Sequence, residues 1–272
     1  MSLKRLLTEA VVVDSMFDIE QELLNIKESI LEQMIVEGVD DPGILKCVFM
    51  AGGPGSGKSY TAKEVFGVGK ELTASFASSG LKIVNSDNAF EKGLKDNGIN
   101  PKDLGKIEKE DPELWAKIIV GDDSIRGKAK KLTQTQQKFY ENGRLGMIID
   151  GTGDDFIKMK KKVQHAKELG YDCYMVFVNT SLEVALERNR KRDRTLSDEL
   201  VTEIWKDCQN NLGKFQSLFS GNMVIVDNTV YKPINSAVQK AIDGFIRKPI
   251  YNQIGKKWIA TARLLKKSNL IK

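Results

Sequence analysis

The sequence predicts an α/β fold in which helices cover both faces of a parallel sheet. Short apolar runs typical of strands recur along the chain, with helix-forming segments between them. Several of these runs are continuously apolar and do not alternate, as expected for parallel strands that are buried on both faces. A glycine-rich segment directly follows the first run. These observations predict one α/β domain over 46–246.

Strands and helices are expected to alternate along this domain. The strands are predicted at 48–50, 81–84, 145–150, 171–178 and 223–227. Helices are predicted at 60–66, 89–95, 122–140, 154–170, 181–190, 197–219 and 234–246, and a further one is expected to start at 111–112. Residues 96–112 are polar and contain glycine and proline, which predicts a loop or an insertion.

Two segments lie outside the α/β domain. In the N-terminal segment 1–45, apolar residues recur at spacings of three and four over 15–37, which predicts an amphipathic helix. This helix is expected to cover an edge of the sheet, and a docking or dimerising helix is the alternative. The C-terminal extension 247–272 is basic, because residues 244–272 contain eight lysines and arginines and no acid. The rest of the chain carries 34 basic and 37 acidic residues, so any polyanion-binding surface belongs to the extension.

The composition is typical of a globular cytoplasmic protein, with 41% hydrophobic and 29% charged residues. No apolar stretch is long enough to span a bilayer, so no membrane partner is expected. Cys47, Cys173 and Cys208 lie far apart in the sequence, which is neither a disulfide framework nor a metal-binding pattern. We therefore expect a reducing, cytoplasmic location.

The segment after the first predicted strand has the pattern of a phosphate-binding loop. Residues 52–59 read G-x-x-x-x-G-K-S, the Walker A pattern, and a predicted helix follows. Glycines let backbone N–H groups approach a triphosphate closely, and Lys58 is expected to reach the β and γ phosphates while Ser59 binds Mg²⁺. The nucleotide-binding candidates are Gly52, Gly53, Pro54, Gly55, Ser56, Gly57, Lys58, Ser59 and Tyr60. The alternative is a glycine-rich hairpin that contains a lysine by chance.

Three acidic residues follow predicted strands, at the edge where ligands bind in open α/β sheets. Asp150 follows the apolar run 147–149, as in a Walker B strand, and is expected to hold Mg²⁺ or, alternatively, only to cap a loop. Asp87 follows the second strand and is expected to accept the proton of an attacking hydroxyl. Its alternative role is to cap the next helix. Asp227 follows the last strand.

The segment 188–197 is rich in arginine and is predicted to form a lid over the phosphates. Arg188 and Arg192 are four residues apart, as are Arg190 and Arg194, so a helix here would bring like charges together. A bound anion would remove this repulsion, and the arginines would stabilise the charge of the transferring phosphoryl group. The catalytic candidates in the lid are Arg188, Arg192 and Arg194. A solvated charged turn is the alternative.

These motifs resemble those of the P-loop kinases that include zeta toxins and phage-type polynucleotide kinases. The stretch 83–90, Ile-Val-Asn-Ser-Asp-Asn-Ala-Phe, is similar to the turn that carries the family's general base, which implies this role for Asp87. Arg188, Asn189 and Arg192 look like the family's R-N-x-x-R lid. The stretch 226–229 is similar to the ending of the family's last strand, near the nucleotide base, which implies a nucleotide contact for Asn228.

The resemblance covers 46–246 and implies a P-loop NTPase fold of the kinase type, with ATP and Mg²⁺ as cofactors. Within that range, 96–144 is interpreted as an insertion on the acceptor side. The function it implies is an ATP-dependent transfer of the γ-phosphate to a hydroxyl-bearing acceptor, such as a nucleotide sugar in zeta-like enzymes. GTP stays open as an alternative donor.

Two other functions are weighed against this one. A 5′-hydroxyl polynucleotide kinase would use nucleic acid as a partner, and residues 256–258 combine two lysines with a tryptophan. The apolar residues Ile254, Trp258, Ala262 and Leu265, however, recur at helical spacing, which favours a helix docked on the core. A nucleotide-hydrolysing switch is the other alternative. Because glycine follows Asp150, no glutamate is placed there to activate water, which favours transfer over hydrolysis.

Overall fold

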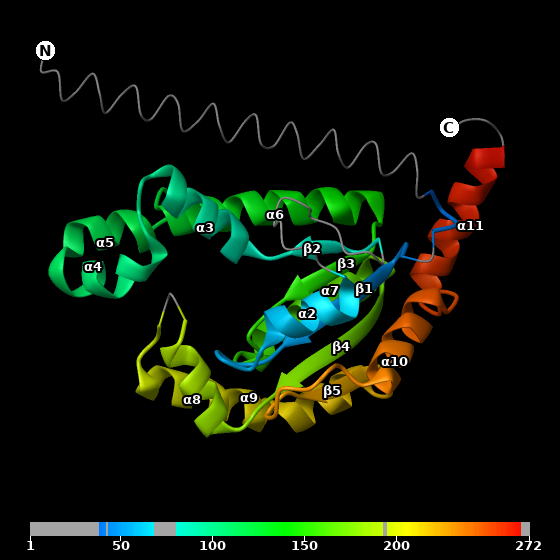
Figure 1. Cartoon of the computed structure of the whole chain (residues 1–272). Helices are drawn as coiled ribbons and strands as arrows, with labels where there is room; N and C mark the ends of the chain where they lie inside the picture. Colours follow the sequence, from blue (N-terminus) through cyan, green and yellow to red (C-terminus); the bar gives the residue numbers. More distant parts are fainter. Residues whose placement is uncertain (1–37, 42, 68–79, 193–194, 268–272) are drawn as a thin grey trace, which may run out of the picture.

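The computed structural model describes residues 38–41, 43–67, 80–192 and 195–267 (Figure 1). The amphipathic helix predicted at 15–37 lies outside the described residues, as does the lid candidate Arg194.

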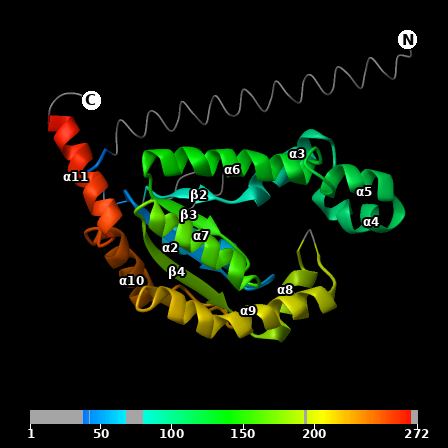
Figure 2. The ribbon, with the colours of Figure 1, turned by 180° about the vertical axis from the view of Figure 1, so that it is seen from behind.

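A five-stranded sheet forms the centre of the fold, with the strand order β2-β3-β1-β4-β5. The strands are β1 (Lys46–Ala51), β2 (Lys82–Val84), β3 (Met147–Asp150), β4 (Asp172–Asn179) and β5 (Met223–Asp227). Every pairing is parallel, and helices lie on both faces of the sheet, which confirms the predicted α/β fold (Figures 1 and 2). Because β1 is the central strand, the loop that follows it lies in the middle of the sheet's carboxyl edge.

The helices occupy nearly all of the positions that the sequence predicts. They are α2 (Lys58–Phe66), α3 (Ser86–Asp96), α4 (Leu104–Glu110), α5 (Pro112–Ile119), α6 (Ile125–Gly143), α7 (Phe156–Glu168), α8 (Leu182–Arg190), α9 (Asp198–Phe219), α10 (Ser236–Arg247) and α11 (Gln253–Lys267), with a short 3₁₀ helix η1 (Pro101–Asp103). Five of them begin where a side-chain oxygen accepts a hydrogen bond from the backbone N–H three residues later. These caps are Asp111, Ser124, Asp155, Ser181 and Ser197. In the described part of the chain, no helix is long and apolar enough to cross a membrane.

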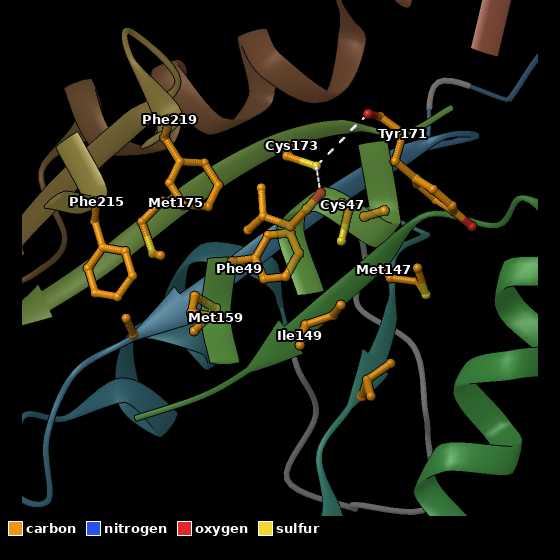
Figure 3. Packing of buried hydrophobic residues seen from close by; sticks show 14 of the residues in the cluster. Cys47, Phe49, Met147, Ile149, Met159, Tyr171, Cys173, Met175, Phe215 and Phe219 are labelled. Atoms are coloured by element: carbon orange, nitrogen blue, oxygen red, sulfur yellow. Dashed lines mark hydrogen bonds between the residues drawn. The ribbon is translucent and has the colours of Figure 1, made fainter. Parts of the chain in front are cut away.

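The sheet is buried on both faces, which explains why its strands read as continuous apolar runs. Alternate residues of β1 enter different clusters: Phe49 packs with residues of α7 and α9 on one face, and Met50 packs with residues of α2 and α10 on the other. Figure 3 shows the first of these clusters, in which Phe215 and Phe219 of α9 lie over the sheet near Phe49 and Met175.

The expectation of a loop at 96–112 is wrong, because this segment contains η1 and α4. Its few apolar side chains are too widely scattered to show a helical period, but Leu104 is buried in a third cluster. That cluster is separate from the two on the sheet and also contains Phe90, Leu94 and Ile118. Helices α3 to α6 thus form a small packed unit at the carboxyl edge of the sheet, opposite α8 (Figure 1).

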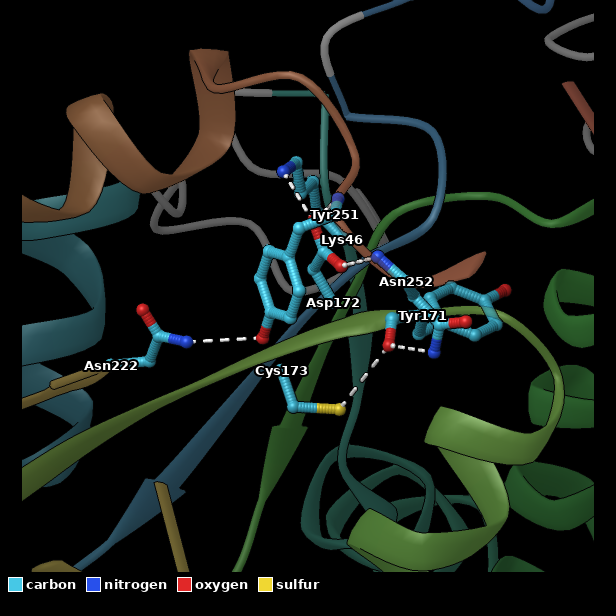
Figure 4. A network of polar contacts seen from close by, with 7 residues as sticks. All are labelled: Lys46, Tyr171, Asp172, Cys173, Asn222, Tyr251 and Asn252. Carbon is cyan, nitrogen blue, oxygen red and sulfur yellow. Dashed lines mark hydrogen bonds and ion pairs between the residues drawn. The ribbon is translucent and has the colours of Figure 1, made fainter. Parts of the chain in front are cut away.

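The basic extension is anchored on the opposite, amino edge of the sheet. Lys46 and Asp172, at the starts of β1 and β4, form a buried ion pair with an N–O distance of 3.1 Å. The same carboxylate accepts hydrogen bonds of 3.0 Å from the backbone N–H groups of Tyr251 and Asn252, just before α11 (Figure 4). The carboxylate of Asp172 therefore connects the starts of the two strands to the residues that directly precede α11.

Helix α11 packs on the core, as predicted, through the middle of the predicted stripe. Trp258 packs against the cluster of Figure 3 and Ala262 is buried, whereas Ile254 is 51% and Leu265 39% exposed. At Gly255 the backbones approach so closely that an added Cβ would lie 2.3 Å from the carbonyl oxygen of Gly170. This glycine contact, which the stripe does not include, brings the start of the helix close to the turn before β4.

Candidate active site

The phosphate loop connects β1 to α2 at the centre of the carboxyl edge. Gly55 and Gly57 have φ angles of 74° and 88°, in the left-handed region that favours glycine. A Cβ at Gly55 would lie 2.3 Å from the carbonyl oxygen of Ala185, and one at Gly57 would lie 2.0 Å from Nδ2 of Asn228. The loop is thus pressed between α8 and the end of β5, and only glycine fits at these two positions.

The polar groups of the loop are arranged as an anion site requires. Lys58 Nζ donates a hydrogen bond of 2.6 Å to the carbonyl of Gly52, so its side chain folds back over the loop. The Ser56 hydroxyl is buried and has no hydrogen-bond partner among the described residues. Ser59, in the first turn of α2, is exposed. A buried, unpartnered hydroxyl beside a helix N-terminus and a lysine fits a phosphate group.

Asn228 and Tyr60, two further nucleotide candidates, both lie near the segment that follows β5. Asn228 is buried, and its Nδ2 donates a hydrogen bond of 2.8 Å to the carbonyl of Ser56. Its amide therefore holds the loop in place. The ring of Tyr60 lies 5.2 Å from that of Tyr231, which is 74% exposed and follows β5. Sequence reasoning missed Tyr231, because nothing local distinguishes it from any exposed loop tyrosine.

Asp150 lies next to the loop because the register of β3 with β1 pairs it with Met50. Its Oδ2 accepts a hydrogen bond of 3.0 Å from Nδ2 of Asn85, while its Oδ1 is buried without a partner in the described part of the chain. Burial raises the pKa of this carboxyl above its ordinary value of 3.8; the charge of Lys58 opposes the increase and that of Asp87 adds to it. An unpartnered, buried carboxylate oxygen is the group that a bound cation would stabilise.

The residues present fit a magnesium ion that is shared with phosphate. Within the described residues, no group of three or more acidic, histidine or cysteine side chains could hold a metal without other ligands. Mg²⁺ in phosphate sites is typically bound by one or two protein side chains, with water and phosphate oxygens completing the shell. Asp150 and the Ser59 hydroxyl are the side chains that would hold it.

We expect Asp150→Asn to stabilise the protein without nucleotide, by about 1 kcal/mol at neutral pH, because it removes an ionised carboxylate from a buried position. The pKa of Asp150 is raised in the folded chain, so this advantage is present at neutral pH and disappears below pH 3.8, where the carboxyl is protonated in both states. Urea unfolding followed by circular dichroism at several pH values measures it. Asp154→Asn, which removes an exposed carboxylate nearby, is the control. A destabilised Asp150→Asn protein would contradict the expectation.

Asp87 lies in the first turn of α3, near Asp150. The cap of this helix is Asn85, whose Oδ1 accepts a hydrogen bond of 2.8 Å from the backbone N–H of Asp87. The side chain of Asp87 is therefore not used as the cap. It is 54% exposed and pairs with Nη1 of Arg126, at 2.9 Å.

Arg126 is a site residue that the sequence analysis did not find. It lies in the first turn of α6, and its guanidinium lies 5.0 Å from the ring centroid of Phe90. Because 39 residues separate it from Asp87, no spacing rule connects the two. It brings a positive charge from α6 to Asp87.

The described arginines of the predicted lid make different contacts. Arg188 Nη1 lies 3.5 Å from the carbonyl oxygen of Gly55, so it reaches the phosphate loop. Arg192 is exposed, and Arg190 forms an ion pair with Asp198. The side chain of Asn189 is buried and connects the end of α8 to Leu196. Its Nδ2 donates a hydrogen bond of 2.8 Å to the carbonyl of Leu196, and its Oδ1 accepts one of 3.2 Å from the N–H of the same residue.

The structure thus brings Lys58, Asp87, Asp150 and Arg188 to the same end of the sheet. Asp227 is exposed, and its carboxylate accepts a hydrogen bond from the N–H of Thr229, which lowers its pKa. This third acid therefore shapes the turn after β5.

Comparison with known proteins identifies one family. The model of the family described as "AAA domain" matches residues 47–215, which include the phosphate loop, Asp87, Asp150 and most of α9. None of the curated proteins compared with the chain is similar to it in sequence.

Three solved structures similar to the chain are each 15% identical to it. A structure from a study of the PezAT chromosomal toxin-antitoxin system of Streptococcus pneumoniae covers 89% of this chain and 95% of its own, with a TM-score of 0.46. The match to a structure of AvrRxo1-ORF1 with AvrRxo1-ORF2 covers 77% of this chain and 62% of that chain, with a TM-score of 0.46. The match to shikimate kinase from Acinetobacter baumannii covers 73% of this chain and 90% of that chain, with a TM-score of 0.32.

Proposed function

We propose, from the premise that the chain belongs to the AAA-domain family matched over 47–215, that it is an ATP-dependent kinase that phosphorylates a hydroxyl group. The fold is that of a P-loop NTPase of the kinase type. The finer assignment, a zeta toxin-like kinase with ATP, Mg²⁺ and a small acceptor, is our proposal, and a cytoplasmic location stays a prediction.

The observation that carries the proposal is the pair of acids beside the phosphate loop. Asp150 is buried with an unpartnered oxygen, as suits a magnesium ligand, whereas Asp87 is half exposed, as suits a base that meets an acceptor. The charges of Asp87 and Lys58 both act on the carboxyl of Asp150 and shift its pKa in opposite directions, so the three lie close together. Two carboxylates in different environments are what phosphoryl transfer to a hydroxyl requires.

Each residue has a separate role in this proposal. Lys58 exchanges its contact with the carbonyl of Gly52 for the phosphates and neutralises part of their charge. Arg188, which reaches Gly55, adds charge from the lid side. Asp87 accepts the proton of the acceptor hydroxyl. Magnesium, when held by Ser59 and Asp150, would supply further neutralisation of the phosphate oxygens.

The acceptor is expected to lie between the phosphate loop and the α3–α6 unit. Arg126 holds Asp87 in an ion pair, so the Oδ1 atom of Asp87 is occupied by the guanidinium. An acceptor that carries its own anionic group, such as a nucleotide sugar, would attract Arg126 and release Asp87 for proton transfer. We therefore favour a phosphorylated small-molecule acceptor.

No observation favours the polynucleotide kinase or the hydrolytic switch. Helix α11, which is part of the basic C-terminal extension, lies at the amino edge of the sheet, away from the phosphate loop (Figure 1). Trp258 packs against the core, so its ring is not a free stacking surface. The extension therefore supplies no argument for a nucleic-acid acceptor at this site.

The test is a transfer assay with purified full-length protein, Mg²⁺ and γ-labelled ATP. Three acceptors are offered: nucleotide sugars, 5′-hydroxyl oligonucleotides and mixed protein. We expect label on a nucleotide sugar, with a loss of at least about 100-fold in Lys58→Ala, since that variant lacks the charge that meets the phosphates. Lys63→Ala, on an exposed part of the same helix, is the matched control. Release of free phosphate with no labelled acceptor would overturn the kinase assignment.

A further inference from the structure

A hollow of about 490 Å³ lies at the amino edge of the sheet, at the opposite end of β1 from the phosphate loop. It is formed by the start of β1 and the loop before it, the end of α10 and the turn that follows it, and α11. Its aliphatic wall includes Ile44, Ile250 and Ile259, and its cations include Arg247, Lys248 and Lys256. Sites for small organic ligands are typically roughly 300–1,000 Å³, so the hollow has a suitable size. Its lining combines apolar and charged residues in similar numbers, which suits a ligand that carries both an organic part and a charged group.

Positive charge exceeds negative charge in the hollow. The acids that line it are Asp40 and Asp41; Asp40 pairs with Arg263 and Lys266, and Asp41 accepts a hydrogen bond from the N–H of Gly43. The buried Lys46 on its floor is matched by Asp172. None of Arg247, Lys248 and Lys256 forms an ion pair with another described residue. Three cations from α10 and α11 thus converge on one concavity without a counter-ion from the described chain.

Bringing these cations together is unfavourable without an anion. The charge of Lys248 lowers the pKa of Lys46, in addition to the larger decrease caused by burial. Lys256 lies in the first turn of α11, where the helix dipole disfavours cations, and that turn contains no acid. The chain therefore places like charges around a hollow with one aliphatic wall, an arrangement that a bound anion would stabilise.

We propose that this hollow binds a small phosphorylated organic molecule, independently of the phosphate loop. The phosphate would contact Arg247, Lys248 and Lys256, and the organic part would lie on the aliphatic wall. A nucleic-acid strand fits less well, because the cations face one concavity and Trp258, the aromatic ring of α11, packs on the core. The site lies outside the predicted active site and does not depend on the proposed kinase activity.

The experiment separates this site from the phosphate loop by working with the full chain that carries Lys58→Ala. Adenosine 5′-monophosphate is titrated into this protein by calorimetry, and the titration is repeated with Lys256→Gln and, separately, Arg247→Gln added. Each is expected to weaken binding about tenfold, as the loss of one charged hydrogen bond would. Lys257→Gln is the matched control: it removes the same charge from the next residue of α11, which does not line the hollow, and should change affinity by less than about twofold.

Three results would overturn the proposal. The first is that adenosine 5′-monophosphate does not bind measurably to the Lys58→Ala protein. The second is that neither Lys256→Gln nor Arg247→Gln changes the affinity, and the third is that Lys256→Gln and Lys257→Gln weaken binding equally. The last would indicate a general attraction to the basic helix. A 5′-hydroxyl oligonucleotide is titrated in parallel; tighter binding of this polymer, sensitive to Lys256 and Lys257 alike, would assign the surface to nucleic acid instead. Lys256 and Arg247 are exposed, and circular dichroism checks that each variant folds.

Discussion

The Asp87→Asn protein is expected to lose phosphoryl transfer by a factor of about 10²–10⁴ while still binding ATP, since a positioned general base contributes that much. The substitution keeps the shape of the side chain and leaves an oxygen that can accept the hydrogen bond from Arg126. It removes the ability to take the acceptor's proton, together with the negative charge that pairs with Arg126. The measurement is the initial rate of label transfer from γ-labelled ATP to the acceptor, with nucleotide affinity determined separately by calorimetry.

Asp96→Asn is the matched control for this result. Asp96 is the last residue of the same helix, α3, is exposed, and undergoes the same change of charge. Its transfer rate should stay within about twofold of that of the unmodified chain, as for a surface charge remote from the chemistry. A transfer rate in Asp87→Asn above half the unmodified value would remove Asp87 as the base. Equal losses in ATP affinity and in rate would instead indicate that Asp87 contributes to nucleotide binding.

Asp172→Ala is expected to destabilise the fold by about 3–5 kcal/mol, the usual cost of removing one partner from a buried ion pair. Lys46 and Asp172 are 2% and 0% exposed, so the lysine would be left charged and without its partner inside the protein. The N–H groups of Tyr251 and Asn252 would lose their acceptor as well, which should loosen α11 (Figure 4). Urea unfolding followed by circular dichroism measures the loss.

The pH dependence of this variant provides a second check. Burial lowers the pKa of Lys46 below 10.5 in the folded chain, and without Asp172 nothing opposes that decrease. The unfolded state then binds the proton more tightly than the folded state, so the penalty should shrink as the pH rises towards 10.5. Asp198→Ala, which breaks the exposed pair with Arg190, is the control and should cost much less. If both variants lost the same free energy of unfolding, the buried Lys46–Asp172 pair would contribute no more to stability than an exposed pair.

The sequence by itself determined the features that depend on neighbouring residues. The phosphate loop is readable because its glycines, Lys58 and Ser59 are consecutive, and the strands are readable because parallel strands buried on both faces are apolar throughout. The candidate acids are readable too, since Asp87 and Asp150 directly follow strands that end at one edge. These are local patterns, and a local pattern is visible before the chain folds.

Only the tertiary structure decided the features that join distant parts of the chain. The helix α4 is too short to show its period and exists because Leu104 packs with Phe90 and Ile118. The ion pair of Arg126 with Asp87 joins residues 39 apart, and that of Lys46 with Asp172 joins residues 126 apart.

The hollow beside α11 needs three separate segments, and the contact of Gly255 with Gly170 brings the start of α11 close to the turn before β4. Such contacts depend on which surfaces meet when the chain closes on itself. Spacing along the sequence carries no information about that.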